Sequence, residues 1–439
     1  MIMKKNLIKK SMLDLRHYRR IFLLAIVLSV GIPTQNYAFQ DLMAQNEEYT
    51  SYKGEIVDSE TSKPLVFASL TLVGTNISTV TNTEGRFLLK VPANTESTTL
   101  EVSFLGYRSK TVTLTSLTPD ENRIGLDVLV TELPEVNISV PREAVTLVKE
   151  TLRKKGENYL QDPSVMTAFY RETIKKRRRN VSLSEAVVSI FKTPYTSSRR
   201  DAVQMFKSRK STDYSKLDTL VLKLQGGPFN ALYVDVMKYP EYIFSEDSID
   251  DYDFRFDRST RINDRLIYVI SFNQKDNILD PLYRGELFID VEKKVLTSAI
   301  YSLNITDRNK ASRLFVRKKP RNADVYPVEV AYRVDYREKD GRWYYGYSNA
   351  LLEFKINWDK KLFNSVYSMT CEMAVTDWEK NSELSEPRFR DRLKSTMILS
   401  DEASGFSDPD FWGEYNIIEP EKSIESAIRK IQRQLRKQG

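Results

Sequence analysis

The chain has 439 residues and a formal net charge of +7, of which residues 1–38 supply +6 through seven basic residues and one acidic residue. The net charge of the remaining chain is therefore near +1 (7 − 6). A nucleic-acid-binding protein is expected to carry a clear excess of positive charge, so this function loses its main support. The sequence contains one histidine, His17, and one cysteine, Cys371. His17 lies within residues 1–38, a segment expected to be removed as a signal peptide, so the mature chain has no histidine for a Ser-His-Asp triad, an H-E-x-x-H zinc site or a Cys-His pair. One cysteine cannot form an internal disulfide.

The N-terminal segment predicts a secretory signal peptide over residues 1–38. A basic stretch precedes the apolar run from Ile21 to Ile32, and Ala38 is the preferred cleavage point. The alternative is an N-terminal membrane anchor, but the run is shorter than the roughly 20 residues that a spanning helix needs. No later segment is apolar enough to span a bilayer as a helix, so we expect an exported protein.

Residues 51–131 predict a seven-stranded β-sandwich. Short β-type runs such as "RFLLKV" and "TTLEVSFL" follow one another, with turn residues and no helical period between them. In the second run Leu100, Val102 and Phe104 share a face, which is the pattern of a sheet with one buried side. We therefore expect an all-β domain at this end of the chain.

The same stretch resembles the carboxypeptidase-like regulatory domain, a transthyretin-like sandwich. The family pattern is carried by Gly54 to Val57, Thr61, Pro64, Leu65, Ala68, Leu70, Thr81, Gly85, Phe87, Phe104, Gly106 and Tyr107. The resemblance implies an exported protein of Bacteroidota without peptidase activity, because such domains accompany metallocarboxypeptidases but do not hold their zinc. A turn position that is often Asp is Asn82 here, which weakens a calcium interpretation and leaves an Asx turn with Gly85 at positive φ.

The rest of the chain predicts three segments. Residues 132–141 form a linker, and residues 142–385 form a helix plus a large bent antiparallel sheet, an incomplete barrel with packed helices. Residues 386–439 form an aromatic segment and a helix. Val145, Val148 and Leu152 give the helix one apolar face. Hairpins are expected to turn around Asp290 to Lys294 and at Asp340-Gly341. The predicted fold class is therefore mainly β, a sandwich followed by an α+β domain.

Residues 282–303, "LYRGELFIDVEKKVLTSAIYSL", are similar to a strand pair of outer-membrane lipoprotein-sorting proteins, which hold acyl chains on an apolar concave face. "TAFYRETIKKRRRNVSLSEAVVSIFKTPY" resembles the C-terminal half of uncharacterised exported Bacteroidota proteins that carry the same sandwich. These resemblances imply a place in the periplasm or at the periplasmic face of the outer membrane. From the sheet curvature we expect an open concave face, unless the C-terminal helix fills it with Ile424, Ile428 and Ile431.

Two groups of residues are candidates for contact with lipid or a partner protein. The first is a basic run between two strand-like segments, Lys175, Lys176, Arg177, Arg178 and Arg179. It predicts a hairpin tip that is either solvated or in contact with phosphate-bearing lipid or an acidic partner. The second is the set Trp343, Tyr345 and Tyr347, which strand alternation places on one face, opposite Tyr344, one of the two sets being core.

No catalytic, cofactor-binding or metal-ligating residue is expected, since the acidic run 246–257 lacks the EF-hand pattern. Two functions of different classes remain. The first is a non-enzymatic envelope protein, with a sandwich that mediates protein contacts and a sheet domain that binds an apolar ligand or an outer-membrane partner. The second is a carboxylate-dependent hydrolase acting on glycans, which needs two carboxyl groups facing each other across a pocket.

Overall fold

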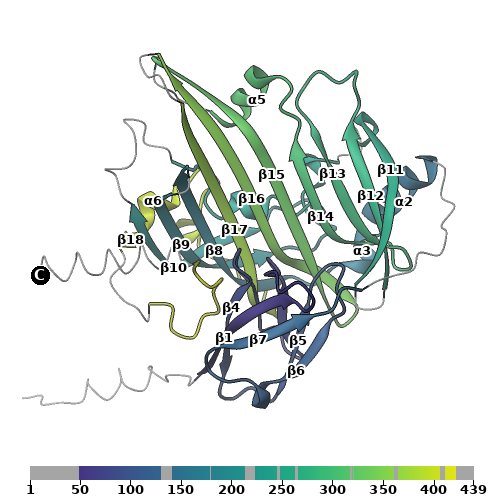
Figure 1. The fold of residues 1–439 in the computed structure, drawn as a ribbon, viewed down its shortest axis with the longest axis vertical. Helices are drawn as coiled ribbons and strands as arrows, with labels where there is room; N and C mark the ends of the chain where they lie inside the picture. Colours follow the sequence, from purple (N-terminus) through teal and green to yellow (C-terminus); the bar gives the residue numbers. More distant parts are fainter. Residues whose placement is uncertain are drawn as a thin grey trace, which may run out of the picture. The chain divides into compact units, whose positions relative to one another are not determined.

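The computed structural model describes residues 49–129, 141–177, 179–212, 223–244, 248–262, 265–316, 319, 321–359, 364–405 and 411–421. Strands dominate both parts of this region, an N-terminal sandwich and a large curved sheet (Figure 1). The predicted signal peptide 1–38, the linker up to Val140 and the C-terminal helix with Ile424, Ile428 and Ile431 lie outside the described residues. Within the described ranges, no helix is long and apolar enough to cross a membrane.

Seven strands form the N-terminal part: β1 (Tyr49–Asp58), β2 (Ser69–Leu72), β3 (Ser78–Val80), β4 (Arg86–Pro92), β5 (Thr99–Ser103), β6 (Lys110–Thr113) and β7 (Asn122–Leu126), with the 3-10 turn η1 (Leu114–Ser116) before β7. They pair in two sheets, in the orders β4-β1-β7 and β3-β2-β5-β6. Leu70, Leu100 and Val102 are fully buried between the sheets. The predicted seven-stranded sandwich is confirmed.

The connection from β3 to β4 is an Asx turn, as predicted. The Asn82 side-chain oxygen accepts hydrogen bonds from the backbone N–H groups of Glu84 at 2.9 Å and Arg86 at 3.0 Å. Gly85 has φ +71°, and a Cβ at this position would lie 2.8 Å from the backbone oxygen of Ile56. The turn therefore requires glycine for its positive φ and for the close approach of β1.

Within the described residues, eleven strands form one sheet in the order β11-β12-β13-β14-β15-β16-β17-β8-β9-β10-β18. These strands are β8 (Ser164–Lys176), β9 (Arg179–Lys192), β10 (Ala202–Thr212), β11 (Tyr252–Ile262), β12 (Arg265–Gln274), β13 (Tyr283–Asp290), β14 (Val295–Leu303), β15 (Ala323–Lys339), β16 (Arg342–Trp358), β17 (Ser365–Lys380) and β18 (Ser404–Gly405). All neighbours are antiparallel except β18, which runs parallel to β10. Because β11 and β18 do not pair with each other, the sheet is an incomplete barrel, as predicted.

The predicted hairpin turns are confirmed. Asp340 and Gly341 alone join β15 to β16, with φ values of +51° and +77°, which suit a type I′ turn. Residues 291–294 join β13 to β14, and Lys294 has φ +56°. β8 and β9 form a hairpin with Arg177, at φ +57°, in its tip.

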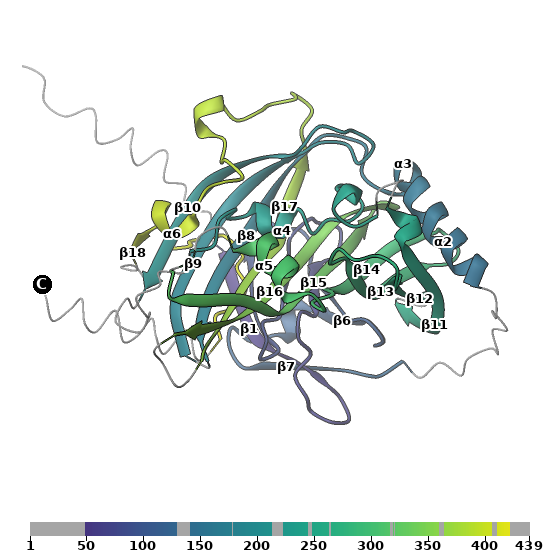
Figure 2. The same ribbon diagram turned by 90° about the horizontal axis from the view of Figure 1, so that it is seen from above.

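The inner face of the curved sheet is filled by the chain itself (Figure 2). The helices of this part are α2 (Pro141–Arg153), α3 (Lys155–Asn158), α4 (Phe229–Leu232), α5 (Arg308–Phe315) and α6 (Leu399–Glu402), and its 3-10 turns are η3 (Pro240–Tyr242), η4 (Ile249–Asp251) and η5 (Phe389–Asp391). Phe229, Leu232, Met237 and Phe244 are at most 6% exposed and share one apolar cluster with the inner side chains of the sheet. The expectation of an open concave face is therefore wrong, because residues 229–244 bring their own apolar side chains to cover it.

The outer face of the sheet is covered by the sandwich and by residues 411–421, called the strap below. Asn416 binds the backbone of Lys90 on β4 twice, accepting from its N–H at 2.7 Å and donating to its oxygen at 2.9 Å. Trp412 is 3% exposed, and its ring meets that of Phe169 edge-on at 5.4 Å between centroids. The strap therefore joins the sandwich to the sheet.

Candidate functional site

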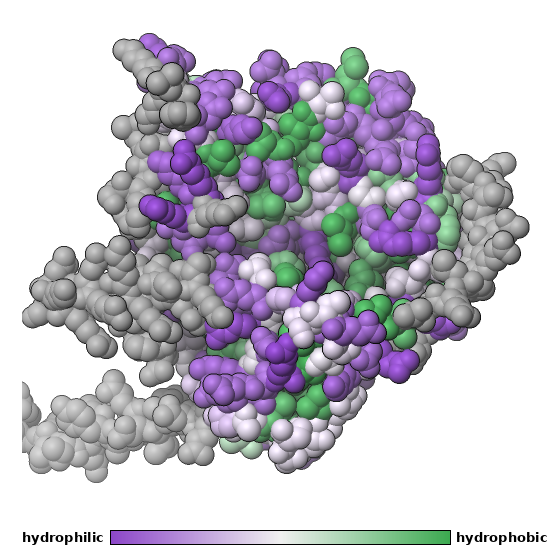
Figure 3. Space-filling model, viewed as in Figure 1, coloured by the Kyte–Doolittle hydropathy of each residue, from purple (hydrophilic) through white to green (hydrophobic). Residues whose placement is uncertain are grey.

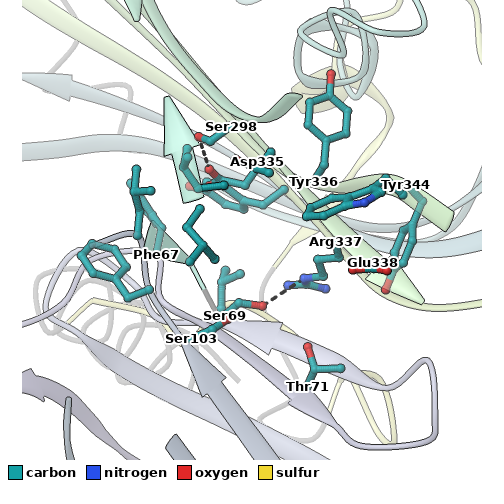
Figure 4. Close-up of a pocket in the computed structure, with 18 of the residues that line it drawn as sticks. Phe67, Ser69, Thr71, Ser103, Ser298, Asp335, Tyr336, Arg337, Glu338 and Tyr344 are labelled. Atoms are coloured by element: carbon teal, nitrogen blue, oxygen red, sulfur yellow. Dashed lines mark hydrogen bonds between the residues drawn. The ribbon is translucent and has the colours of Figure 1, made fainter. Parts of the chain in front are cut away.

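A cavity of about 320 Å³, called the junction cavity below, lies between the outward side of β2 and β5 and the outer face of the large sheet (Figure 4). Its polar and aromatic lining residues include Phe67, Ser69, Thr71, Glu101, Ser103 and Phe104 from the sandwich and Arg265, Ser298, Arg333, Asp335, Arg337, Glu338, Trp343 and Tyr344 from the sheet. Hydrophilic and hydrophobic side chains are mixed over this junction (Figure 3). The volume is at the small end for ligand-binding pockets.

Strand alternation supplies both walls of the junction cavity. On β2 and β5, apolar side chains point into the sandwich, so the alternate hydroxyl and carboxyl side chains point toward the cavity. On β15, Val334 and Tyr336 belong to the inner core, whereas Arg333, Asp335 and Arg337 face the cavity. Figure 4 shows the Tyr336 ring turned away from it. The site is therefore built from the sides of two sheets that their own cores do not use.

Arg337 ties the two walls together. Its Nε donates to Ser69 Oγ at 3.0 Å, and its Nη1 donates to the backbone oxygen of Val375 at 2.8 Å (Figure 4 shows the first). The guanidinium group also reaches Ser78 Oγ and the backbone oxygen of Thr79 on β3. Burial lowers the pKa of Arg337, and these four acceptors are uncharged, so dipoles from both parts of the chain hold its positive charge.

Two more guanidinium groups face the cavity within ion pairs. Arg333 Nε lies 2.8 Å from one Asp335 carboxylate oxygen, and Ser298 Oγ donates to the other at 2.6 Å. Arg265 pairs with Glu338, and aromatic rings lie within 6.0 Å of both guanidinium groups. The cavity therefore offers hydroxyl groups, paired charges and aromatic faces, next to the apolar side chains of Val80, Leu105, Ile262 and Ile267.

The described residues do not form a metal site, because no group of three potential ligands is placed to hold an ion. A glycan hydrolase needs one protonated and one ionised carboxyl group at the same cavity. On the sheet wall, Asp335 and Glu338 are each engaged by an arginine. Glu172, whose pKa is strongly raised, lies on the inner face of the sheet and does not line the junction cavity.

A second polar cluster, which sequence reasoning missed, lies buried on the inner face. Lys192 Nζ is 2.9 Å from Asp201 Oδ2 and 2.7 Å from Asp235 Oδ2, and all three residues are at most 4% exposed. The hydroxyl groups of Tyr239 and Tyr336 donate to the two carboxylates at 2.7 and 2.9 Å. Burial lowers the pKa of Lys192, but the two carboxylates outweigh it and raise this pKa above its usual value. Lys192 therefore remains charged inside the core.

Glu172 lies on the same inner face, next to Tyr170 and Cys371. Burial raises the pKa of Glu172 to about 8, and the Tyr170 hydroxyl donates to its carboxyl group at 2.8 Å. Cys371 pairs with Glu172 in the register of β17 with β8 and is fully buried, which also raises its pKa. Cys371 is therefore a buried free thiol.

The basic run is a hairpin tip, as predicted. The described tip residues are Lys175, Lys176, Arg177 and Arg179, and Arg178 lies outside the described residues. Lys175 Nζ lies 3.2 Å from a carboxylate oxygen of Glu421 at the end of the strap. The Lys176 ammonium lies 5.8 Å from the ring centroid of Tyr367. Two of the tip cations thus contact the protein itself, and their contact with lipid or a partner stays a prediction.

Trp343, Tyr345 and Tyr347 do not share one face of β16, so that expectation is wrong. The pairing of β15 with β16 skips Gly346, which forms a bulge between the two tyrosines. The extra residue leaves Tyr345 on the inner face and turns Tyr347 to the outer face. The three side chains are 6%, 0% and 1% exposed, so protein buries all of them, and their contact with a ligand stays a prediction.

Comparison with known proteins assigns the sandwich. Residues 52–140 match the family model of the CarboxypepD_reg-like domain, which confirms the resemblance noted for residues 51–131. No curated protein matches the sequence. The family match covers the sandwich and leaves the large sheet without an assignment.

Solved structures give only distant likenesses for the rest. A putative outer membrane lipoprotein-sorting protein domain from Vibrio parahaemolyticus aligns over 56% of this chain and 96% of its own, with 10% identity and a TM-score of 0.25. A DUF1329 family protein from Desulfovibrio piger aligns over 55% and 95%, with 11% identity and a TM-score of 0.24. A LolA superfamily protein from Nitrosomonas europaea aligns over 54% and 97%, with 9% identity and a TM-score of 0.18. These scores are too low to support a functional statement.

Proposed function

We propose that this chain is a non-enzymatic binding protein of the cell envelope, in the periplasm or at the periplasmic face of the outer membrane. Its binding site is the junction cavity, and its ligand is a polar segment of a periplasmic or outer-membrane partner protein. One observation carries the proposal: both parts of the chain contribute walls to the cavity, and those walls carry hydroxyl, guanidinium and carboxylate groups.

The charges of the cavity favour an ordered polar ligand. Arg333 and Asp335 present opposite charges 2.8 Å apart on one wall, and Ser69, Thr71 and Ser103 present hydroxyl groups on the other. Such an arrangement selects a partner segment by complementary charge and hydrogen bonding more than by apolar area. An apolar ligand is less well supported, because residues 229–244 fill the inner face where we expected it.

Site-specific photo-crosslinking in the cell envelope tests the proposal. A photoreactive side chain at Thr71, inside the cavity, is expected to form an adduct with a single partner protein. The matched control places the same side chain at Thr113, an exposed threonine on β6 of the same sandwich, and is expected to form no such adduct. Ser103→Trp, which fills the cavity, should abolish the Thr71 adduct while the protein stays folded by circular dichroism.

Four results would overturn the proposal. The first is the absence of an adduct at Thr71, and the second is the same adduct from Thr71 and Thr113. The third is glycan cleavage by the purified protein, which would establish the hydrolase instead. A lipid that co-purifies in native mass spectrometry and is displaced by Ser103→Trp would assign the cavity to an apolar ligand.

A further inference from the structure

The loop that follows β17 carries two large apolar side chains that are exposed to solvent. Phe389 is 87% exposed and Leu384 is 67% exposed. They lie five residues apart, in a connection that contains only the short turn η5. Single exposed apolar residues are common, but two of this size in one short loop, together called the apolar tip below, are a candidate contact surface.

Hydrogen bonds hold this loop in place. The Asn381 side chain donates to the backbone oxygen of Ser385 and accepts from its N–H, both at 2.8 Å, and this clamp encloses Leu384 at φ +52°. Farther along, Arg392 Nε donates to the backbone oxygen of Pro387 at 3.0 Å. Leucine rarely adopts a positive φ, so the clamp holds an unusual backbone that presents the side chain outward.

Positive charge surrounds the apolar tip. Arg388 and Arg390 flank Phe389 directly and are exposed, and Arg390 Nε lies 3.5 Å from a carboxylate oxygen of Asp391. Glu386 binds Arg392 at 2.6 Å and also pairs with Arg199 on the neighbouring connection between β9 and β10. Residues 383–394 together with 199–200 contain six basic and three acidic side chains, a net charge of +3. The tip therefore combines exposed apolar groups with an excess of arginine.

We propose that this loop is a membrane-docking site, with Leu384 and Phe389 inserted among the lipids and the surrounding arginines bound to anionic headgroups. A small apolar tip within a basic rim matches a membrane interface, where apolar insertion and attraction to anionic lipids act together. The inference is independent of the junction cavity and of its ligand.

The basic hairpin tip at Lys175 to Arg179 is the competing membrane contact. It lies at the other end of β9, whose 14 residues span roughly 45 Å, so the two basic ends do not form one patch. Of the described tip residues, Lys175 is engaged by Glu421 and Lys176 by the Tyr367 ring. The loop after β17 has large exposed apolar side chains next to its charges, Leu384 and Phe389, whereas the described residues of the hairpin tip have none.

Co-sedimentation with lipid vesicles tests the proposal. The mature chain, without the predicted signal peptide 1–38, should bind phosphatidylcholine vesicles that contain roughly one-third phosphatidylglycerol, and bind pure phosphatidylcholine vesicles weakly. The double variant Leu384→Ser/Phe389→Ser should bind at least about tenfold more weakly. Leu279→Ser, at a 79% exposed leucine between β12 and β13, is the matched control and should bind like wild type.

A fluorescent reporter gives a second measurement, which follows the environment of residue 389 directly. Phe389→Trp should keep vesicle binding and shift its emission to the blue when anionic vesicles are added, because the indole leaves water. Failure of the wild type to bind anionic vesicles would overturn the proposal, as would unchanged binding by the double serine variant. Loss of binding through Lys175→Gln/Lys176→Gln, with the double serine variant unaffected, would assign the membrane contact to the hairpin tip.

Discussion

The two faces of the large sheet are made by the same strands and are covered in different ways. On β8, Tyr170 and Glu172 point inward, whereas Phe169 and Arg171 point outward. Helices and irregular segments of the same domain cover the inner face, whereas the sandwich and the strap cover the outer face. The inner face is therefore completed locally, and the outer face depends on segments from both ends of the chain.

The buried charges of the two faces differ in the same way. On the inner face Lys192 is held by two carboxylates inside a closed, aromatic environment. On the outer face Arg171 is bound to Glu185 at 2.8 Å and to the backbone oxygen of Ile418 in the strap at 2.7 Å. The Arg171 network includes a residue of the strap, so its hydrogen bonds depend on the position of the strap. The Lys192 network is made within the sheet domain alone. The difference indicates that the inner face stabilises the fold and the outer face joins the parts of the chain.

Lys192→Met gives the largest expected effect and tests the closed network of the inner face. It leaves Asp201 and Asp235 buried without their cation, which we expect to lower the free energy of unfolding by about 3–5 kcal/mol. Urea unfolding monitored by circular dichroism measures the change. Lys149→Met, which breaks an exposed pair with Asp250, is the control and should change the free energy of unfolding far less. Equal effects of the two substitutions would contradict a stabilising role for the buried cluster.

Trp412→Ala tests how strongly the strap holds the outer face. It removes a buried indole that packs on Phe169 and lies 4.8 Å from the Arg209 guanidinium. We expect a loss of about 3 kcal/mol in the free energy of unfolding, from the deleted apolar contacts and the space left behind. Phe389→Ala, at an 87% exposed position, should change it by less than about 0.5 kcal/mol. If Trp412→Ala changes no more than this control, the strap is not a stabilising part of the fold.

Glu172→Gln tests the inner face through pH. The pKa of Glu172 is about 8 in the folded state, compared with 4.5 as its ordinary value, so the folded protein holds this proton more tightly. Its stabilisation is complete below pH 4.5 and is lost as the pH rises toward 8, at up to about 1.4 kcal/mol per pH unit. Glutamine cannot ionise, so the wild-type stability should fall relative to the variant across this window in urea unfolding at several pH values. A constant difference between the two proteins would show that the carboxyl group is ionised in the folded state.

Local signals allowed several parts of the fold to be predicted. Turn residues such as Asp340-Gly341 and Gly85 carry their own backbone requirements, so the hairpins and the sandwich turn follow from short stretches. The Gly346 bulge was missed because alternation was extended through a glycine, although glycine inside a strand often marks such a bulge. One extra residue then reversed the face assigned to Tyr347.

The candidate site was less predictable than the fold, because it depends on contacts between distant segments. Strand alternation alone puts Arg333, Asp335 and Arg337 on one face of β15, and it does not indicate that this face meets β2 and β5 of the sandwich. Likewise, residues 229–244, from Phe229 to Phe244, are rich in apolar side chains but have no regular helical or strand period. Their position on the inner face could therefore not be predicted from the sequence.

The strap also bears on the order in which the molecule is completed. Asn416 binds Lys90 across 326 positions of the chain, so this contact forms only after nearly all of the protein has been synthesised. The sandwich has its own core and can fold early, as N-terminal domains generally do. Closing so long a connection makes docking a non-local and comparatively slow step. We therefore expect the strap to dock late in folding, after the sandwich and the sheet have formed.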